Sequence, residues 1–175
     1  MKILTAPFSI GEAGELRAGD LVELSGVIWT GRDAAHKRLI ALLDAGEALP
    51  VDLRDQVIYF TGPCPAPPGH VIGSAGPTTS GRMDAYSPRL IRECGLRGMI
   101  GKGVRSPEVA AAMRECTAVY FAATGGAGAL ISQCVKKCDV VAFPELGPEA
   151  VYRLEVEKFP LVVAMDSAGG SLYAR

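Results

Sequence analysis

The sequence predicts an α/β fold in which a mixed or parallel central sheet has helices on its flanks. Three observations support this: compact apolar segments recur through the middle of the chain, glycine-rich turns end several of them, and segments with helical spacing alternate with them. The 175 residues are enough for one domain with a sizeable core. Because there is no clear internal linker and no repeat, we expect residues 1–175 to form a single domain.

The first elements are predicted from β-forming residues and helix-end signals. A short apolar entry at 4–8 precedes a strand at 21–30, which is rich in β-formers and partly alternates. Asp33 can cap a helix over 34–45, and Gly46 ends that helix.

The middle of the chain holds two compact apolar strands, at 57–60 and 98–100. Between them lie a stiff loop at 64–69, which contains three prolines, and a segment over 80–94 with helical spacing. The run 106–108 begins the next helix with a serine cap, a proline at the first helical position and an acid in the first turn.

The last third is predicted to hold a helix that runs from the glycine-rich turn 124–128 through Lys137, and an exposed edge strand at 152–158. Apolar strands are expected at 118–123, 139–143 and 160–166.

The composition excludes several classes of protein. Hydrophobic residues make up 49% of the chain and charged residues 21%, so it is expected to fold. The net charge is −1 and there is no basic run, which argues against a nucleic-acid partner. No apolar stretch reaches membrane-spanning length, and residues 1–7 lack the apolar core of a signal peptide. The expected compartment is the cytoplasm.

The five cysteines are an odd number in apolar surroundings, which suits a reducing compartment better than a disulfide framework. Cys134 and Cys138 could face the same way on a helix, and Cys64 could join them in space. Because structural metal sites normally need four ligands at recognisable spacing, we expect no metal site bound by this chain alone.

One stretch, residues 73–84, combines glycines, a proline, hydroxyl side chains and an arginine directly after an apolar segment. Its backbone N–H groups could turn inward and bind a carboxylate or phosphate. The alternative is a Gly-Pro turn whose hydroxyls cap the next helix.

Cations follow three of the apolar segments. Arg32 stands in a turn after the predicted strand at 21–30, Arg82 after the apolar run that ends at 71–72, and Lys102 after the predicted strand at 98–100. Ligands gather at such strand ends in open sheets. The three could converge on a small dianion. The alternative is that Arg32 and Lys102 are solvated surface charges and that His36 is a partly buried histidine beside Arg32.

Two glycine-rich runs resemble nucleotide-binding motifs but lack residues that those motifs require. The run 101–103 lacks the Ser/Thr that follows a P-loop lysine, and the run 126–131 has isoleucine where the dinucleotide fingerprint requires a small residue.

Three blocks, residues 30–38, 76–84 and 99–103, together resemble the signature blocks of the β subunit of class I fumarate hydratase. The same blocks occur in the related L(+)-tartrate dehydratase β subunit, and the similarity runs from about residue 16 to 173. The resemblance implies a swivelling β/β/α domain that works only with a larger α subunit. In this family the α subunit, not the β chain, holds a [4Fe-4S] cluster through three cysteines, and the open iron binds the substrate.

The resemblance also assigns roles to matching residues. Thr78 would be the base that takes a proton from the carbon next to a carboxylate. A threonine hydroxyl is a poor base by itself, so this role needs positive charge nearby, from Arg82 and Lys102. The implied substrate-binding residues are Arg32, Arg82 and Lys102 on the carboxylates, Thr79 and the Gly76 backbone around the pocket, and His36 in or near it.

The implied activity is the reversible hydration of fumarate to (S)-malate by a hydro-lyase, expected as an α2β2 assembly that is active only with its α subunit. L(+)-tartrate or another C4 diacid is the alternative substrate. A non-catalytic anion-binding regulatory module is the rival class, and the presence of Thr78, Arg82 and Lys102 counts against it.

Overall fold

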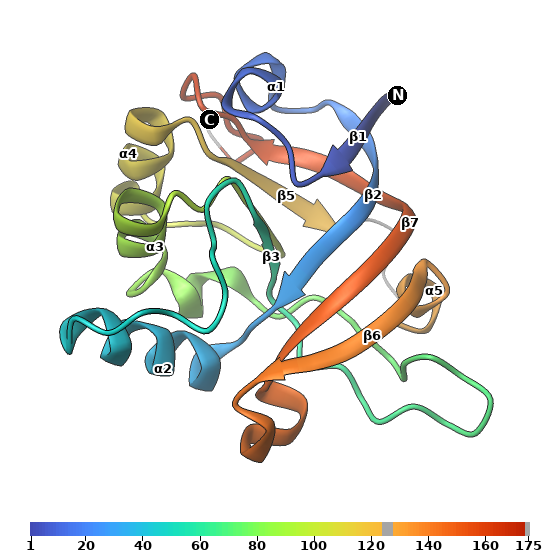
Figure 1. The fold of residues 1–175 in the computed structure, drawn as a ribbon. Helices are drawn as coiled ribbons and strands as arrows, with labels where there is room; N and C mark the ends of the chain where they lie inside the picture. Colours follow the sequence, from blue (N-terminus) through green and yellow to red (C-terminus); the bar gives the residue numbers. More distant parts are fainter. Residues whose placement is uncertain (124–127, 174–175) are drawn as a thin grey trace.

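A computed structural model describes residues 1–123 and 128–173 of the chain. These residues form one seven-stranded mixed sheet in the order β1-β2-β3-β4-β5-β7-β6, and an additional β2–β7 pairing closes it into a barrel-like shape (Figure 1). Strands β1 to β5 are parallel, whereas β7 is antiparallel to β2, β5 and β6. The strands are β1 (Lys2–Ala6), β2 (Leu21–Thr30), β3 (Val57–Tyr59), β4 (Gly98–Gly101), β5 (Val119–Ala123), β6 (Val135–Ala142) and β7 (Val151–Met165).

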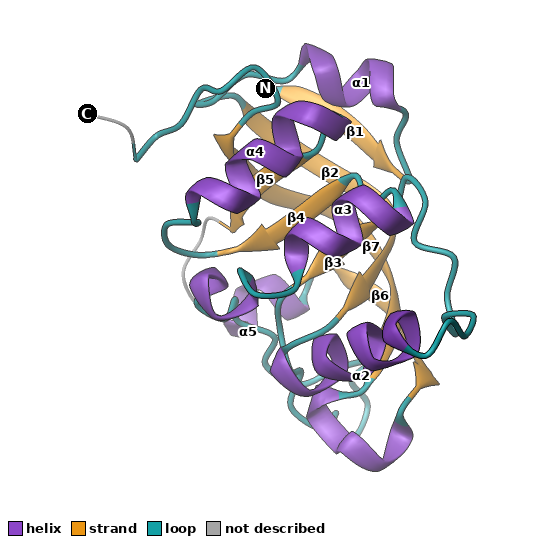
Figure 2. Ribbon diagram, turned by 90° about the vertical axis from the view of Figure 1, so that its left-hand side faces the viewer, coloured by secondary structure: helices purple, strands orange, loops and turns teal. Residues whose placement is uncertain are grey.

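Helices flank this sheet, as the sequence predicts. Figure 2 shows α2, α3 and α4 on the same side of it, with α3 beside α4. None of the described helices is long and apolar enough to cross a membrane. The helical elements are α1 (Ile10–Glu15), α2 (Asp33–Asp44), α3 (Ser87–Cys94), α4 (Pro107–Cys116), α5 (Gly128–Ser132) and the 3₁₀ turns η1 (Ser80–Met83) and η2 (Pro144–Glu149).

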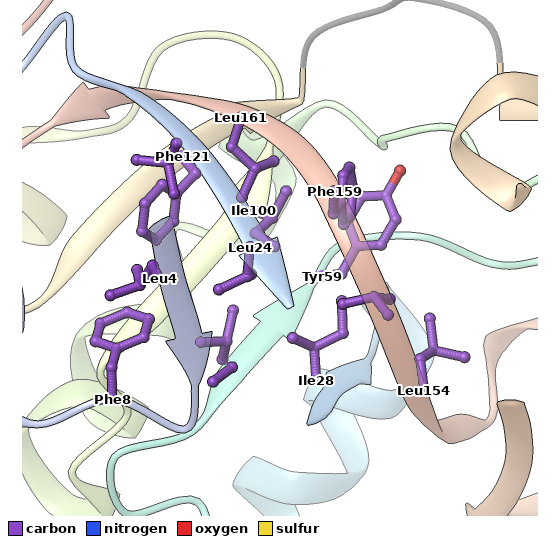
Figure 3. Packing of buried hydrophobic residues seen from close by; sticks show 14 of the residues in the cluster. Leu4, Phe8, Leu24, Ile28, Tyr59, Ile100, Phe121, Leu154, Phe159 and Leu161 are labelled. Carbon is purple, nitrogen blue, oxygen red and sulfur yellow. The ribbon is translucent and has the colours of Figure 1, made fainter. Parts of the chain in front are cut away.

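The central strands are apolar on both faces because they separate two hydrophobic clusters. Val57 and Tyr59 of β3 belong to the cluster enclosed by the barrel (Figure 3), which also contains Phe159. Ile58 and Phe60, next to them in sequence, belong to the cluster beneath α3 and α4. This alternation explains why β3 appears in the sequence as a continuous apolar run rather than as an alternating pattern.

The prediction of a helix through Lys137 is wrong. Helix α5 ends at Ser132, and residues 135–142 form β6, which pairs with β7 from Val151 to Val156. Cys138 therefore lies in a strand, so it does not share a helix face with Cys134. The predicted glycine-rich turn at 124–127 lies outside the described residues.

The prediction of an exposed edge strand at 152–158 is also wrong. Residues 151–165 form one long strand, β7, which pairs with β2 on one side and with β6 and β5 on the other. The register with β2 shifts between Leu24 and Gly26. Gly26 has a φ of +107°, and a Cβ there would stand 2.2 Å from the Ala6 carbonyl oxygen, so the shift requires glycine at this position.

Two helix starts differ in detail from the prediction. The segment 80–94 is divided into η1 and α3, with α3 beginning at Ser87. Asp33 is the first residue of α2 rather than its cap; Arg32 holds the cap position without a side-chain hydrogen bond. The Asp33 carboxylate does not cap the helix; it accepts a hydrogen bond from Arg82 instead.

Candidate functional site

The site is built where β2, β3 and β4 end, because the carboxyl ends of parallel strands meet at one edge of a sheet. The segment around Thr78 crosses this edge. The Thr78 N–H donates to the Phe60 carbonyl just after β3, at 2.7 Å, and the Ser80 N–H donates to the Lys102 carbonyl just after β4, at 2.8 Å. The turn that carries Thr78 is therefore fixed by main-chain bonds to the ends of both strands.

Thr79 and Lys102 are held side by side at this edge by a parallel β-bridge. Both residues are exposed, and Thr78 is half-buried. In the part of the chain that the structure describes, the Thr78 hydroxyl has no hydrogen-bond partner and Lys102 has no ion-pair partner. Both groups can therefore reach a bound molecule without first breaking an interaction among these residues.

Arg32 follows β2 and lies against the turn after β3. A Cβ on Gly62 would stand 2.7 Å from Arg32 Nη1 and 3.0 Å from its Cδ, so the missing side chain leaves the space for the arginine. The buried Arg32 Nε has no hydrogen-bond partner in the described structure, and the nearest carboxylate oxygen, from Glu149, is 4.0 Å away. An unpaired buried N–H of a charged group is costly, so the carboxylate of Glu149 is the group that offsets this charge in the described structure.

Arg82 is paired with Asp33, whose carboxylate oxygen accepts a hydrogen bond from Arg82 Nη2. The Arg82 side chain is 55% exposed and the Asp33 side chain 32% exposed. The pair joins η1 to the first residue of α2, so Arg82 is held near the Arg32 turn.

His36 lies in the core beneath the same turn. Its Nδ1–H donates to the Arg32 carbonyl at 2.8 Å, and its ring packs edge-on against Phe60 with centroids 5.4 Å apart. Complete burial lowers the His36 pKa to about 4, so the ring is neutral at pH 7. Through this bond His36 holds the main chain of Arg32; its contact with a substrate stays a prediction.

Gly76 lies where two hydroxyls anchor the turn. Thr61 Oγ1 donates to the Gly76 carbonyl at 2.7 Å, and the Tyr59 hydroxyl donates to the Ala75 carbonyl at 2.5 Å. Helix α5 begins against this backbone, since a Cβ on Gly128 would stand 2.6 Å from the Gly76 nitrogen. The backbone of the turn is thus packed from both sides.

All of the sequence-predicted site residues lie at or beneath one strand-end edge. Three cations lie at this edge together with two carboxylates, Asp33 beside Arg82 and Glu149 beside Arg32, and Lys102 is the cation without an ion-pair partner among the described residues. Such an arrangement can bind a small dianion through charge-assisted hydrogen bonds beside the Thr78 hydroxyl.

Sequence reasoning missed two carboxylates at this edge, Asp33 and Glu149. Asp33 was expected to cap a helix, and its pairing with Arg82 depends on how β2 and η1 meet. Glu149 comes from η2, far along the chain, and accepts a hydrogen bond from the Ala34 N–H at 3.3 Å. No local signal marks either role.

A groove of about 310 Å³ beside the site contains none of the predicted site residues. Cys64 and Cys138 both line it, together with Tyr152 and apolar side chains. Cys134 does not line this groove, so Cys64 shares it with only one of the two cysteines that it was expected to join. Among the described residues, no three His, Cys, Asp or Glu side chains come together as a metal site.

Comparison with known proteins gives a consistent family. A profile described as "Fumarase C-terminus" matches residues 4–175. The chain is 41% identical over 153 residues to the anaerobic class I fumarate hydratase of Escherichia coli, covering 87% of this chain and 28% of that protein. It is 43% identical over 164 residues to a Methanocaldococcus jannaschii protein provisionally named L(+)-tartrate dehydratase subunit beta, covering 91% of this chain and 84% of that protein.

A eukaryotic relative extends the comparison: fumarate hydratase 2 of Leishmania major is 37% identical over 158 residues, which cover 90% of this chain and 28% of that protein. The chain spans between about a quarter and a third of the fumarate hydratases it matches and most of the archaeal subunit. Because the family profile covers nearly all of its residues, the chain belongs to the fumarase C-terminus family.

Proposed function

We propose that this chain is the β subunit of a two-chain iron–sulfur hydro-lyase that hydrates fumarate reversibly to (S)-malate. The observation that carries the proposal is the strand-end edge at which Arg32, Arg82 and Lys102 lie with the Thr78 hydroxyl. Membership of the fumarase C-terminus family supports the same reaction class.

In this proposal the cations bind and orient the two substrate carboxylates. The partly exposed Arg32 guanidinium and the Lys102 ammonium donate to carboxylate oxygens, and Arg82 joins them from its pair with Asp33. Each charge-assisted hydrogen bond contributes roughly 1.5–3 kcal/mol. Thr79 and the Gly76 backbone shape the pocket around the bound acid, and His36 keeps the Arg32 turn in place.

Thr78 acts as the base in the dehydration direction. Its hydroxyl oxygen, as the alkoxide, takes the proton from the carbon next to a carboxylate, and the electron pair left behind spreads onto that carboxylate. The cations at this edge favour the alkoxide and stabilise the charge that develops in the transition state. In hydration the same hydroxyl returns the proton to that carbon.

The cluster belongs to a partner chain in this proposal. We propose that a larger α subunit holds the [4Fe-4S] cluster and covers the open edge, in an α2β2 assembly. The described cysteines do not fit a cluster: only Cys64 and Cys138 share a groove, and it contains none of the residues assigned to the substrate. We assign no step of the reaction on this chain to the cluster.

L(+)-tartrate is the second candidate substrate. The observation that favours it is the 43% identity over 164 residues to the archaeal protein named as an L(+)-tartrate dehydratase subunit beta. Another C4 diacid would use the same edge. For the compartment we propose the cytoplasm, which agrees with five free thiols and no disulfide among them.

The test is anaerobic turnover of fumarate and of L(+)-tartrate by this chain alone and after mixing with a reconstituted cluster-bearing α subunit. We expect activity only in the mixture. Turnover of tartrate but not fumarate would keep the mechanism and change the substrate. Activity of the chain without a partner would contradict the composite site, and a mixture that forms a complex but turns over neither acid would favour the regulatory module.

A further inference from the structure

Arg105 is a buried cation next to the site that the proposed mechanism does not use. Its side chain is 0% exposed, and its guanidinium carbon stands 5.2 Å from the Phe60 ring centre and 4.9 Å from the Tyr120 ring centre. Its Nε–H donates to Asp84 Oδ1 at 2.7 Å. Removing two charges from water is costly, and an apolar side chain of similar volume often serves stability as well or better.

The contacts of this pair join two segments that carry site residues. Asp84 lies two residues after Arg82, and its Oδ2 accepts a hydrogen bond from the Ser106 N–H at 2.8 Å. Arg105 Nη2 donates to Ser87 Oγ at 2.7 Å at the start of α3. The pair therefore connects the chain just beyond Arg82 to the chain just beyond Lys102.

The buried Tyr120 also links these two segments. The Tyr120 hydroxyl lies 2.8 Å from both the Gly103 carbonyl and Ser80 Oγ. Since it has one proton, it donates to the carbonyl and accepts from the Ser80 hydroxyl. The Ser80 N–H in turn donates to Lys102, so the Thr78 turn and the Lys102 loop are joined by side chains as well as by main chain.

We propose that Arg105 and Asp84 are positioning residues that fix the main chain of Lys102 relative to that of Thr78. The proposal deepens the proposed function and rests on it. A displacement of about 1 Å between reacting groups can lower a rate about 100-fold, so such a pair has a catalytic consequence without touching the substrate.

The chain offers a matched control at the opposite end of β4. Arg97 is also largely buried, and its guanidinium donates to Asp55 at 2.8 Å and to the Thr117 carbonyl at 2.9 Å. It precedes β4, whereas Arg105 follows it. Arg97→Met and Arg105→Met each remove one ion pair of a largely buried arginine. Only Arg105 lies next to the site, so Arg97→Met is the control.

The first measurement is amide hydrogen exchange in the free chain, which needs no partner. Two main-chain amides are compared: the Ser80 N–H, which donates to the Lys102 carbonyl, and the Val119 N–H, which donates to the Arg97 carbonyl. In Arg105→Met the exchange rate of the Ser80 N–H, divided by that of the Val119 N–H, is expected to rise at least about tenfold. Arg97→Met is expected to shift the same ratio in the opposite direction. Should Arg105→Met fail to fold, Asp84→Asn gives the same comparison, since its amide oxygen can still accept from Ser106.

The second measurement is kcat in the complex with the α subunit. We expect Arg105→Met to lower kcat about 100-fold with little change in KM. The kcat of Arg105→Lys should be at least about tenfold higher than that of Arg105→Met, and the kcat of Arg97→Met should stay within about twofold of the wild type. An unchanged Ser80 exchange ratio, or equal kcat losses in the two methionine variants, would overturn the proposal. If the wild-type complex is inactive on both acids, the proposed function fails, and the exchange ratio still decides whether the pair positions the two segments.

Discussion

Gly101, the last residue of β4, allows the Thr78 turn to approach the sheet. A Cβ at Gly101 would stand 1.9 Å from Ser80 Oγ and 2.9 Å from Phe60 Cδ2, both far inside contact distance. Gly101→Ala therefore has to displace Ser80, which follows the exposed Thr79 and bonds to Lys102 and Tyr120. The substitution is a direct test of how tightly the turn is packed.

The expected cost follows from two contributions. Forcing a methyl group into packed space costs about 1–3 kcal/mol. Losing the hydrogen bond between Ser80 and Tyr120 costs about 1 kcal/mol more. Gly101→Ala should thus lower the free energy of unfolding by about 2–4 kcal/mol, a large part of the roughly 5–15 kcal/mol of a typical domain.

The assay is a double-mutant cycle measured by urea denaturation. Ser80→Ala removes the oxygen atom that makes the 1.9 Å contact, so Gly101→Ala should cost about 1–2 kcal/mol less in a Ser80→Ala background than in the wild type. If the two changes add to within about 0.5 kcal/mol, the close approach of Ser80 to Gly101 is not a feature of the folded chain and the reasoning is refuted.

Three further changes test other parts of the site. Burial lowers the His36 pKa to about 4, against roughly 6.5 in the unfolded chain, so the unfolded state binds the proton first as the pH falls. The free energy of unfolding should therefore decrease by roughly 3 kcal/mol between pH 6.5 and pH 4. Urea denaturation of His36→Gln over the same pH range should show a smaller decrease. Gly62→Ala puts a Cβ 2.7 Å from Arg32 Nη1 and should raise the KM for the dicarboxylate about tenfold or more in the complex; an unchanged KM would mean that Arg32 does not bind substrate from this position. Asp33→Asn removes the carboxylate that holds Arg82, so KM should rise while the free energy of unfolding changes by less than about 1 kcal/mol, since the pair is partly exposed; a stability loss without a KM change would give the pair a purely structural role.

Elements with complete local signals were predictable from the sequence. The strand at 21–30 has the predicted bounds, and the helix after Ser106 begins with the predicted cap, in which Ser106 Oγ accepts the Val109 N–H at 3.3 Å. The prediction failed for segments whose secondary structure or place in the sheet depends on strands distant in the sequence. Residues 135–142 form a strand because β7 pairs with them, and 152–158 lie inside the sheet because β2 approaches from the far side.

The same distinction applies to the site. Arg32 and Lys102 could be identified as candidates because each directly follows an apolar strand, and the structure places both at the edge where those strands end. The pairing of Arg82 with Asp33 and of Arg105 with Asp84 joins residues 49 and 21 positions apart. These contacts are set by the sheet order and by the path of the 75–80 segment, which no periodicity or spacing in the sequence specifies.

The central claim is that this chain supplies the base of a composite active site. The most direct measurement is kcat for fumarate hydration by the α complex of Thr78→Val, with Thr78→Ser as the control that keeps a hydroxyl. At equal complex formation, we predict that the valine variant loses about 10²–10⁴-fold in kcat and that the serine variant retains most of the activity. A valine variant that turns over fumarate at a rate close to the wild type would contradict the account.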